Sequence, residues 1–200
     1  MNLAFYYHIP IVKKKNQLFC PGYIGVFIDS LAHEVNSLVL IMHESKFDCN
    51  SQYQLRSKNI EFVSLGPKTS SLHRSFFYRK ILKKKIEGLK YCTHFLIRSP
   101  SPLSLYFTKY IDHQNVFFLV VGDYQEVGNQ LKTNSLKNIL LKLYYLFYNF
   151  KFNFLAKKSN LLVNSKQLLD KYSLHCQSLS LVKTTTLSQS DFFERKNTCL

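Results

Sequence analysis

Short apolar runs alternate along the chain with longer amphipathic segments. The apolar runs, which predict strands, lie at 2–11, 38–43, 60–65, 93–97, 115–121, 160–163 and 178–183. The amphipathic segments predict helices at 26–35, 72–89, 103–111, 135–158 and 164–172. Strands that alternate with helices favour a parallel sheet covered by helices on both faces, so the expected fold class is α/β.

The first strand is followed by a basic, polar loop at 13–17 and then by the segment CPGYIG, residues 20–25, which leads into the first helix. Because glycine lacks a Cβ, Gly22 and Gly25 would let a ligand or a facing chain approach the backbone closely. A helix that begins here also points free N–H groups at the crevice, which favours phosphate. The alternative is a plain turn, since the segment matches neither G-x-G-x-x-G nor G-x-x-x-x-G-K-[ST].

Polar pairs stand at the ends of the later predicted strands: Arg98 with Ser99, Asp123 with Tyr124, and Asn164 with Ser165. Asp123 lies just past a buried strand, where open α/β sheets place their ligands. Each pair also has a structural interpretation. Arg98 can be an ion-pair partner, and Asp123 and Asn164 can be helix caps.

The helix predicted at 72–89 is imperfectly amphipathic. Arg74, Lys84 and Lys85 lie opposite its apolar side, but Arg79 and Lys83 fall among the apolar residues. It is either a surface helix on the sheet with snorkelling lysines, or a basic helix that touches anionic lipid head groups. The second interpretation makes the membrane-surface candidates Arg79, Lys80, Lys83, Lys84 and Lys85.

The helix predicted at 135–158 is apolar on both sides. One stripe comprises Leu136, Leu140, Leu143, Phe147, Phe150 and Phe154, and the other side carries Tyr144, Tyr145, Tyr148 and Phe152. Such a helix is buried between layers or lies against a partner or a bilayer surface. We expect burial in the core.

Composition narrows the function classes. A chain of 200 residues with 46% hydrophobic content suits one well-cored domain, and its formal charge of +15 suits nucleic acid, an anionic membrane surface or phosphorylated substrates. The five cysteines are odd in number and form no C-x-x-C pair, which predicts free thiols in a reducing compartment and no metal site. No secretory signal and no membrane span is evident, so we expect a cytoplasmic protein.

The order of these elements resembles the N-terminal half of a GT-B glycosyltransferase of the retaining, family 4 type. The resemblance rests on the strand, PGYIG and helix, followed by LVLIMH, FLIRSPSP, FFLVVGDY and LLVNSKQLLDKY. It implies a Rossmann-like domain at 1–185, which receives the acceptor. The tail at 186–200 would lead towards an absent C-terminal domain that holds the nucleotide-diphosphate sugar.

The resemblance also implies a role for each matching position. Pro21, Gly22, Tyr23 and Gly25 would line the cleft, and Arg98, Ser99, Asp123, Tyr124, Asn164 and Ser165 would face the acceptor or the interdomain surface. No cofactor is expected in this half. The E-x7-E pair that the family uses around the donor has no counterpart in this chain, which implies half an enzyme or one subunit of a split transferase. Its partners would be a saccharide or lipid-linked acceptor, a donor-binding domain or subunit, and an anionic membrane surface reached from the cytoplasm.

Three other functions stay open. The charge could serve a nucleic-acid-binding α/β domain, although the basic residues are dispersed and no recognition motif is present. A nicotinamide-binding Rossmann enzyme would need G-x-G-x-x-G after the first strand, which is absent. A non-catalytic interaction subunit would use exposed apolar surface to bind a partner chain.

Overall fold

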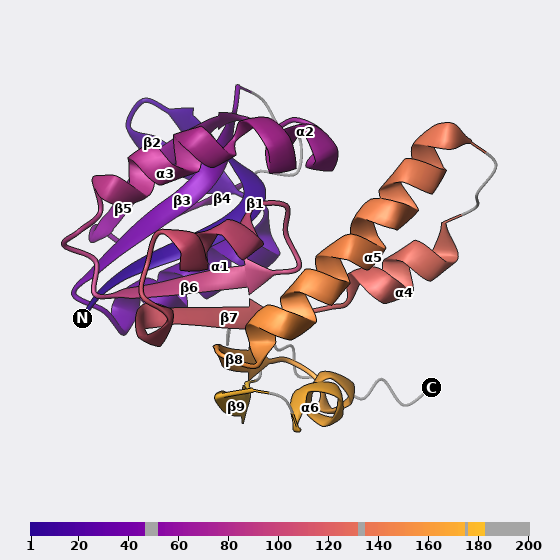
Figure 1. The fold of residues 1–200 in the computed structure, drawn as a ribbon. Helices are drawn as coiled ribbons and strands as arrows, with labels where there is room; N and C mark the ends of the chain where they lie inside the picture. The colour runs from indigo at the N-terminus through magenta and orange to yellow at the C-terminus, as the bar shows by residue number, and fades with distance from the viewer. Residues whose placement is uncertain (47–51, 132–134, 175, 183–200) are drawn as a thin grey trace, which may run out of the picture.

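The computed structural model describes residues 1–46, 52–131, 135–174 and 176–182. It is an α/β fold built on one mixed, mostly parallel sheet (Figure 1). The parallel strands follow the order β5 (Ile60–Pro67), β3 (Ser37–Ser45), β1 (Asn2–Lys14), β6 (His94–Ser99), β7 (Val116–Val120), β8 (Asn160–Val163) and β9 (Ser178–Leu181). The predicted fold class is therefore confirmed, because this is a Rossmann-like arrangement.

The strand order reverses beside β1. From β1 the chain first builds outward through β3 to β5, then crosses back to β6 and builds in the opposite direction. The carboxyl ends of β1 and β6 therefore border the point where the connections diverge. In open α/β sheets this is where ligands bind.

A β-hairpin extends the sheet where a loop was predicted at 13–17. β1 continues to Lys14 and pairs antiparallel with β2 (Gln17–Cys20), and β2 pairs in turn with β4 (Tyr53–Gln54). Lys15 and Asn16 form the turn with φ of 44° and 66°. Two consecutive positive φ values are typical of the tight turns that match the twist of a hairpin, and asparagine tolerates this region better than most residues.

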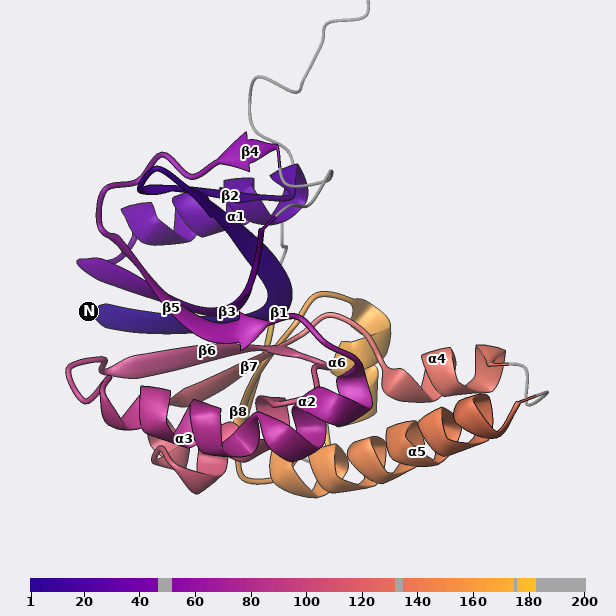
Figure 2. The same cartoon turned by 90° about the horizontal axis from the view of Figure 1, so that it is seen from above.

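Helices cover the two faces of the sheet unequally. α1 (Gly22–His33) lies on one face together with β2 and β4, while α2 (Ser71–Phe77), α3 (Arg79–Glu87) and α5 (Leu136–Ala156) lie on the other (Figure 2). The second layer also holds η1 (Ser104–Lys109) and α6 (Lys166–Tyr172). Because the connection from β3 to β5 carries no helix in its described part, α1 alone supplies the helical cover of its face.

Several predicted helices differ from those observed. The helix at 72–89 is two helices, because the buried Tyr78 interrupts it, donates a hydrogen bond to the Pro67 carbonyl at 2.7 Å and packs against His43. The segment 103–111 contains the 3₁₀ helix η1, and two short helices were not predicted, η2 (His113–Asn115) and α4 (Tyr124–Gln130). The first helix begins at Gly22, four residues before the predicted start at Val26.

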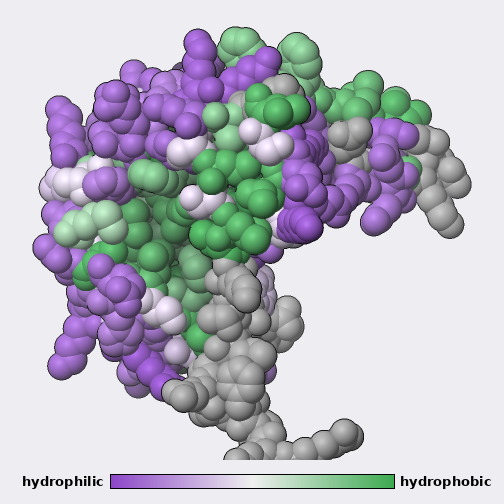
Figure 3. All heavy atoms as spheres, turned by 90° about the horizontal axis from the view of Figure 1, so that it is seen from below, coloured by the Kyte–Doolittle hydropathy of each residue, from purple (hydrophilic) through white to green (hydrophobic). Residues whose placement is uncertain are grey.

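The burial predicted for α5 is wrong for its stripe of leucine and phenylalanine. Tyr148, Phe152 and Ala156 face the sheet, whereas the stripe faces solvent, with Phe150 74% and Phe154 64% exposed. Together with α4, α5 projects beyond the sheet as an arm, and Figure 3 shows apolar side chains along the outer edge of that arm. Its tyrosines pack inward because their hydroxyls find partners there, such as Ser104 for Tyr148 at 2.6 Å.

The cysteines described are free thiols, as predicted. Cys20 and Cys92 are buried and Cys176 is partly buried, while Cys49 and Cys199 lie outside the described residues. Burial raises the pKa of Cys20 to about 12 and that of Cys92 to about 11, so both stay protonated at neutral pH. The tail predicted at 186–200 also lies outside the described residues.

We expect the two glycines of α1 to respond oppositely to alanine. A Cβ on Gly25 would lie 2.2 Å from Cδ1 of Tyr53, whereas a Cβ on Gly22 would meet nothing within 4 Å. Gly25→Ala should therefore lower the free energy of unfolding by about 2 kcal/mol, by pushing Tyr53 off the helix. Gly22→Ala should leave it within about 0.5 kcal/mol of wild type or raise it, since alanine restricts the unfolded chain. Urea denaturation of both variants checks this, and equal losses would contradict the contact with Tyr53.

Candidate functional site

The site begins at an irregularity in β1. Between the pairs Tyr6–Ile41 and Pro10–His43 the chain advances four residues along β1 but only two along β3, so β1 bulges at residues 7–9. Bulges are frequent next to active sites, where they turn side chains away from the regular pleat. The bulge begins directly after the last residue pair between β1 and β6, which is Tyr6 with Ile97.

An aromatic and basic group of side chains, the tyrosine–arginine cluster, comes from three elements at this position. Tyr7 comes from the bulge of β1, Tyr23 from the first turn of α1, and Arg98 from the end of β6. The guanidinium carbon of Arg98 lies 4.3 Å from the centre of the Tyr7 ring. A cation over an aromatic face is attracted to the negative electron density of the ring, so this contact fixes Arg98 without using its hydrogen-bond donors.

The side chains of Tyr7 and Tyr23 interact with each other. Desolvation, the nearby Tyr7 and the hydrogen bond to Tyr7 raise the pKa of Tyr23 to about 12, while the positive charge of Arg98 acts in the opposite direction. Tyr23 is therefore a neutral hydroxyl at physiological pH, and it remains 43% exposed. Neutral phenols both donate and accept hydrogen bonds, which suits them to ligands that carry hydroxyl groups.

The glycine-bearing segment adopts a helical conformation instead of the loop that was predicted. Pro21 is the N-cap of α1, and its carbonyl accepts hydrogen bonds from the backbone N–H groups of Ile24 and Gly25. Gly25 serves the close approach of a facing chain, namely Tyr53, whereas Gly22 borders open space. Only Gly22 thus leaves room for a ligand beside the helix end.

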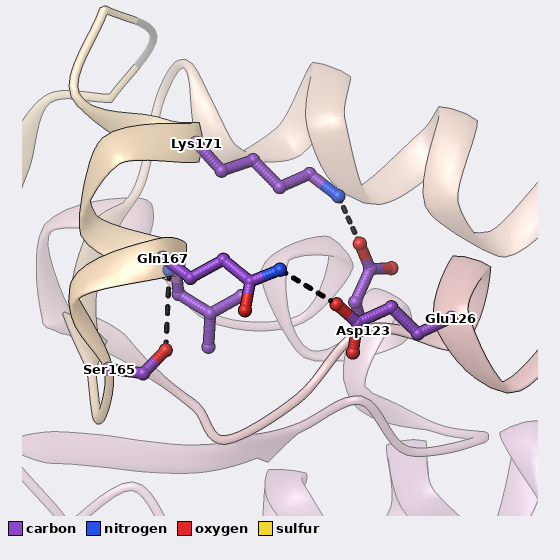
Figure 4. A network of polar contacts seen from close by, with 6 residues as sticks. Asp123, Glu126, Ser165, Gln167 and Lys171 are labelled. Carbon is purple, nitrogen blue, oxygen red and sulfur yellow. Dashed lines mark hydrogen bonds and ion pairs between the residues drawn. The ribbon is translucent and has the colours of Figure 1, made fainter.

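Asp123 and Ser165, one residue from each of the predicted pairs after β7 and β8, lie in a second polar group (Figure 4). Asp123 forms an ion pair with Lys171 of α6, and Glu126 of α4 accepts a hydrogen bond from Gln167 at 3.0 Å. Ser165 caps α6 by accepting from the Leu168 N–H at 3.3 Å, as predicted for a helix starting here, while Asn164 is exposed. These contacts tie α6 to the end of β7, so Asp123 and Ser165 contribute to the packing of this region.

Ser99 and Tyr124 lie between the two groups. Together with Asp123 they line a cavity of about 10 Å³, roughly the volume that one water molecule needs. Tyr124 packs against Tyr145 and Tyr148, with ring centres 4.4 and 4.7 Å apart. The small cavity therefore lies between the end of β6, which carries Ser99, and the segment that follows β7. Tyr124 packs against the aromatic side of α5.

His8, His43 and Arg74 form a cationic cluster that was not predicted from the sequence. Arg74, placed on the solvent side of its helix by the periodicity, is only 4% exposed. Its guanidinium donates to the His8 carbonyl at 3.3 Å and to the Ser71 hydroxyl at 3.4 Å. A histidine inside the first predicted strand was the available signal, but nothing in the sequence placed Arg74 next to it.

The cluster is surrounded by positive charge, and several of its buried nitrogen atoms lack a hydrogen-bond partner. Burial, and then the charges of Arg74 and Lys68, lower the pKa of His8 to about 3; burial and Arg74 lower that of His43 to about 4. Within the described residues, His8 Nδ1, His43 Nε2 and the Nε atoms of Arg74 and Arg98 are buried without a hydrogen-bond partner. Such groups carry a desolvation cost that a ligand can offset.

A larger cavity opens next to the cluster, at the carboxyl ends of β1, β3 and β5. It has a volume of about 810 Å³, and its polar lining includes Lys13, Lys46, Lys68 and Glu44. The positive charge of Lys68 lies close enough to lower the pKa of both His8 and His43. The cavity therefore continues the cationic cluster towards solvent.

The membrane-surface candidates divide in two. Lys80, Lys83, Lys84 and Lys85 are exposed on α3, and Lys83 pairs weakly with Glu87 at 3.8 Å. Arg79 is partly buried, with its guanidinium 4.4 Å from the centre of the Tyr106 ring of η1. The four lysines are therefore available to a partner, whereas Arg79 also fastens α3 to η1.

Comparison with protein-family models gave no match, and no curated protein matches the chain by sequence. Across the part of the chain that the structure describes, no group of three or more histidine, cysteine, aspartate or glutamate side chains could hold a metal ion. None of the described helices combines the length and the apolar character needed to cross a bilayer.

Proposed function

We propose that this domain is the acceptor-binding half of a GT-B glycosyltransferase. The complete enzyme would move a sugar from a nucleotide-diphosphate donor to a saccharide or lipid-linked acceptor in the synthesis of a surface polysaccharide. The observation that carries the proposal is the tyrosine–arginine cluster of Tyr7, Tyr23 and Arg98 at the point where the strand order reverses beside β1. The GT-B resemblance of the sequence supplies the reaction.

The tyrosine–arginine cluster offers what an acceptor-binding half needs. Tyr23 can hydrogen-bond and stack on a sugar, because its ring is 43% exposed and its hydroxyl is a neutral donor and acceptor. Arg98 supplies a positive charge held in place by Tyr7 before any ligand arrives. Such a preorganised charge would offset the negative charge that develops on the leaving diphosphate. The donor itself would be held by a second domain or subunit.

The test is made on the gene product from its own source. We expect an intact mass near twice 23.5 kDa, or a complex with a donor-binding subunit, together with release of nucleoside diphosphate when acceptor is supplied. In that protein Arg98→Ala should lower kcat/KM by about 100-fold, the effect of losing about 2.7 kcal/mol of transition-state stabilisation. A product of 23.5 kDa that binds no such subunit and releases no nucleoside diphosphate would refute the proposal.

We also propose that the domain is peripheral at the inner face of a membrane, held there by the outer side of α5. The described helix carries Lys137, Lys142 and Lys151 but no acidic residue, and its exposed stripe is leucine and phenylalanine. This combination suits the interface of an anionic bilayer, into which apolar side chains insert while lysines reach phosphate groups. The exposed lysines of α3 lie in the same layer (Figure 2) and extend the basic surface.

A further inference from the structure

We propose that Arg74, His8, His43 and Lys68 form a binding site for a phosphoryl group at the carboxyl ends of β1 and β3. This site is distinct from the tyrosine–arginine cluster proposed to bind the acceptor, and the phosphoryl-binding proposal does not depend on glycosyl transfer. The ligand would be a phosphorylated small molecule that reaches the cationic cluster through the adjoining cavity.

The burial of Arg74 is the first reason. The side chain is 4% exposed, and no described carboxylate pairs with it. Removing a guanidinium from water is costly unless an anion compensates for it, so buried arginines are normally paired. Its present partners are one carbonyl and one hydroxyl, both neutral, and both bonds are long at 3.3 and 3.4 Å. An anion would supply the missing charge.

The orientation of the histidines is the second reason. His43 uses Nδ1 in a hydrogen bond with the Gly66 carbonyl at 3.2 Å, so this nitrogen is the donor and Nε2 is the acceptor in the neutral ring. Nε2 is buried without a partner, as is Nδ1 of His8. Binding of a phosphoryl group would favour protonation at these nitrogens, which would then donate to phosphate oxygens. Both imidazoles would gain charge when the ligand binds.

Access to the cluster is the third reason. The cavity of about 810 Å³ is lined by Lys68, whose charge acts on both histidines of the cluster, and also by Lys13 and Lys46. It is large enough for more than phosphate alone, so the ligand can extend beyond its phosphoryl group. One carboxylate, that of Glu44, also lines this cavity and would repel an anion. Glu44→Gln should therefore tighten binding.

The experiment uses the 200-residue chain and three probes at constant ionic strength: inorganic phosphate, pyrophosphate and glucose 1-phosphate. Calorimetry would give the affinities, and NMR of the imidazole protons would give the pKa values of His8 and His43 with and without ligand. We expect saturable binding of at least one probe and a rise of both pKa values from about 3 and about 4 towards 6. Glucose 1-phosphate binding more tightly than phosphate would identify an organic phosphate as the ligand, and equal affinities would identify free phosphate.

Arg74→Met should weaken binding at least tenfold, and Lys68→Gln should weaken it several-fold. Lys80→Gln is the matched control, because it removes one positive charge from an exposed position on α3 without touching the cluster. If Arg74→Met does not fold, Lys68→Gln and Glu44→Gln still test the site, since both residues line the open cavity. Absence of binding, equal losses in Lys68→Gln and Lys80→Gln, or unchanged histidine pKa values would each overturn the proposal.

Discussion

Replacing Asp29 by alanine should lower the free energy of unfolding by about 3 kcal/mol or more, because buried hydrogen bonds to a charged group are costly to lose. Asp29 is only 7% exposed on α1, and its carboxylate organises the segment 53–57. It accepts from the Tyr53 hydroxyl at 2.9 Å, from the Arg56 N–H at 3.1 Å, and from the Ser57 N–H and hydroxyl at 3.0 and 2.9 Å.

The size of this effect comes from the groups that would be left behind. Two backbone N–H donors in a partly buried turn would lose their acceptor, and alanine offers no substitute. The loss would also release Tyr53, whose ring packs over Gly25. Asp29→Asn should fall between alanine and wild type, because its amide oxygen still accepts while its amide nitrogen meets other donors.

Urea denaturation of Asp29→Ala, with Asp170→Ala as the control, makes the comparison. Asp170 is exposed on α6, so its loss should change the free energy of unfolding by no more than about 0.5 kcal/mol. A loss below about 1 kcal/mol at Asp29 would mean that the turn finds other acceptors.

The strands could be predicted from the sequence because buried parallel strands are continuous apolar runs. Each of the predicted strands has an observed counterpart, with ends shifted by a few residues. The hairpin between β1 and β2 could not be predicted, since Lys13 to Gln17 is polar and its turn depends on two positive φ values. Short strands such as β4 depend on pairing with distant segments, which local composition does not encode.

Side-chain burial was harder to predict than backbone structure. The helical period assigned Arg74 to solvent, but the break at Tyr78 and the bulge of β1 bring it against His8. Of the predicted site residues, the structure brings Tyr23 and Arg98 together in the tyrosine–arginine cluster, and Ser99, Asp123 and Tyr124 around a small cavity. Tyr7 was not predicted as a site residue, because it lies in an apolar strand and its ring is buried in the core beside Arg98.

The apolar stripe of α5 shows the same ambiguity most clearly. Periodicity identifies two apolar sides but not which one faces the sheet. The side with tyrosines is buried, because Tyr144 and Tyr148 meet the hydroxyls of Ser75 and Ser104 at 2.7 and 2.6 Å. The leucine and phenylalanine side stays exposed among the described residues, and an exposed apolar stripe of this kind is typical of an interaction surface.

We therefore expect the chain to bind vesicles of phosphatidylglycerol and to bind phosphatidylcholine vesicles much more weakly. The double variant Phe150→Glu with Phe154→Glu should lower the partition coefficient on the anionic vesicles by about 100-fold. Each phenylalanine loses apolar contact worth about 1 kcal/mol or more, and each glutamate adds repulsion from the anionic surface. Lys151 and Lys158 lie over the neighbouring Phe147 and Phe154 rings at 4.6 and 5.8 Å, so their charges sit beside the inserted side chains.

Leu174→Glu is the control, because Leu174 is 86% exposed just beyond α6 and this variant adds one of the double variant's two negative charges at a position away from the α5 stripe. It should keep most of the vesicle binding, and salt should weaken binding of wild type and control alike because the attraction is partly electrostatic.

A second copy of the chain is the competing occupant of the stripe, but two surfaces of a chain with charge +15 would repel each other. Sedimentation equilibrium without vesicles separates the two. A dimer that the α5 variant dissociates, with no vesicle binding by wild type, would assign the stripe to self-association, whereas a monomer that binds only anionic vesicles would assign it to the membrane.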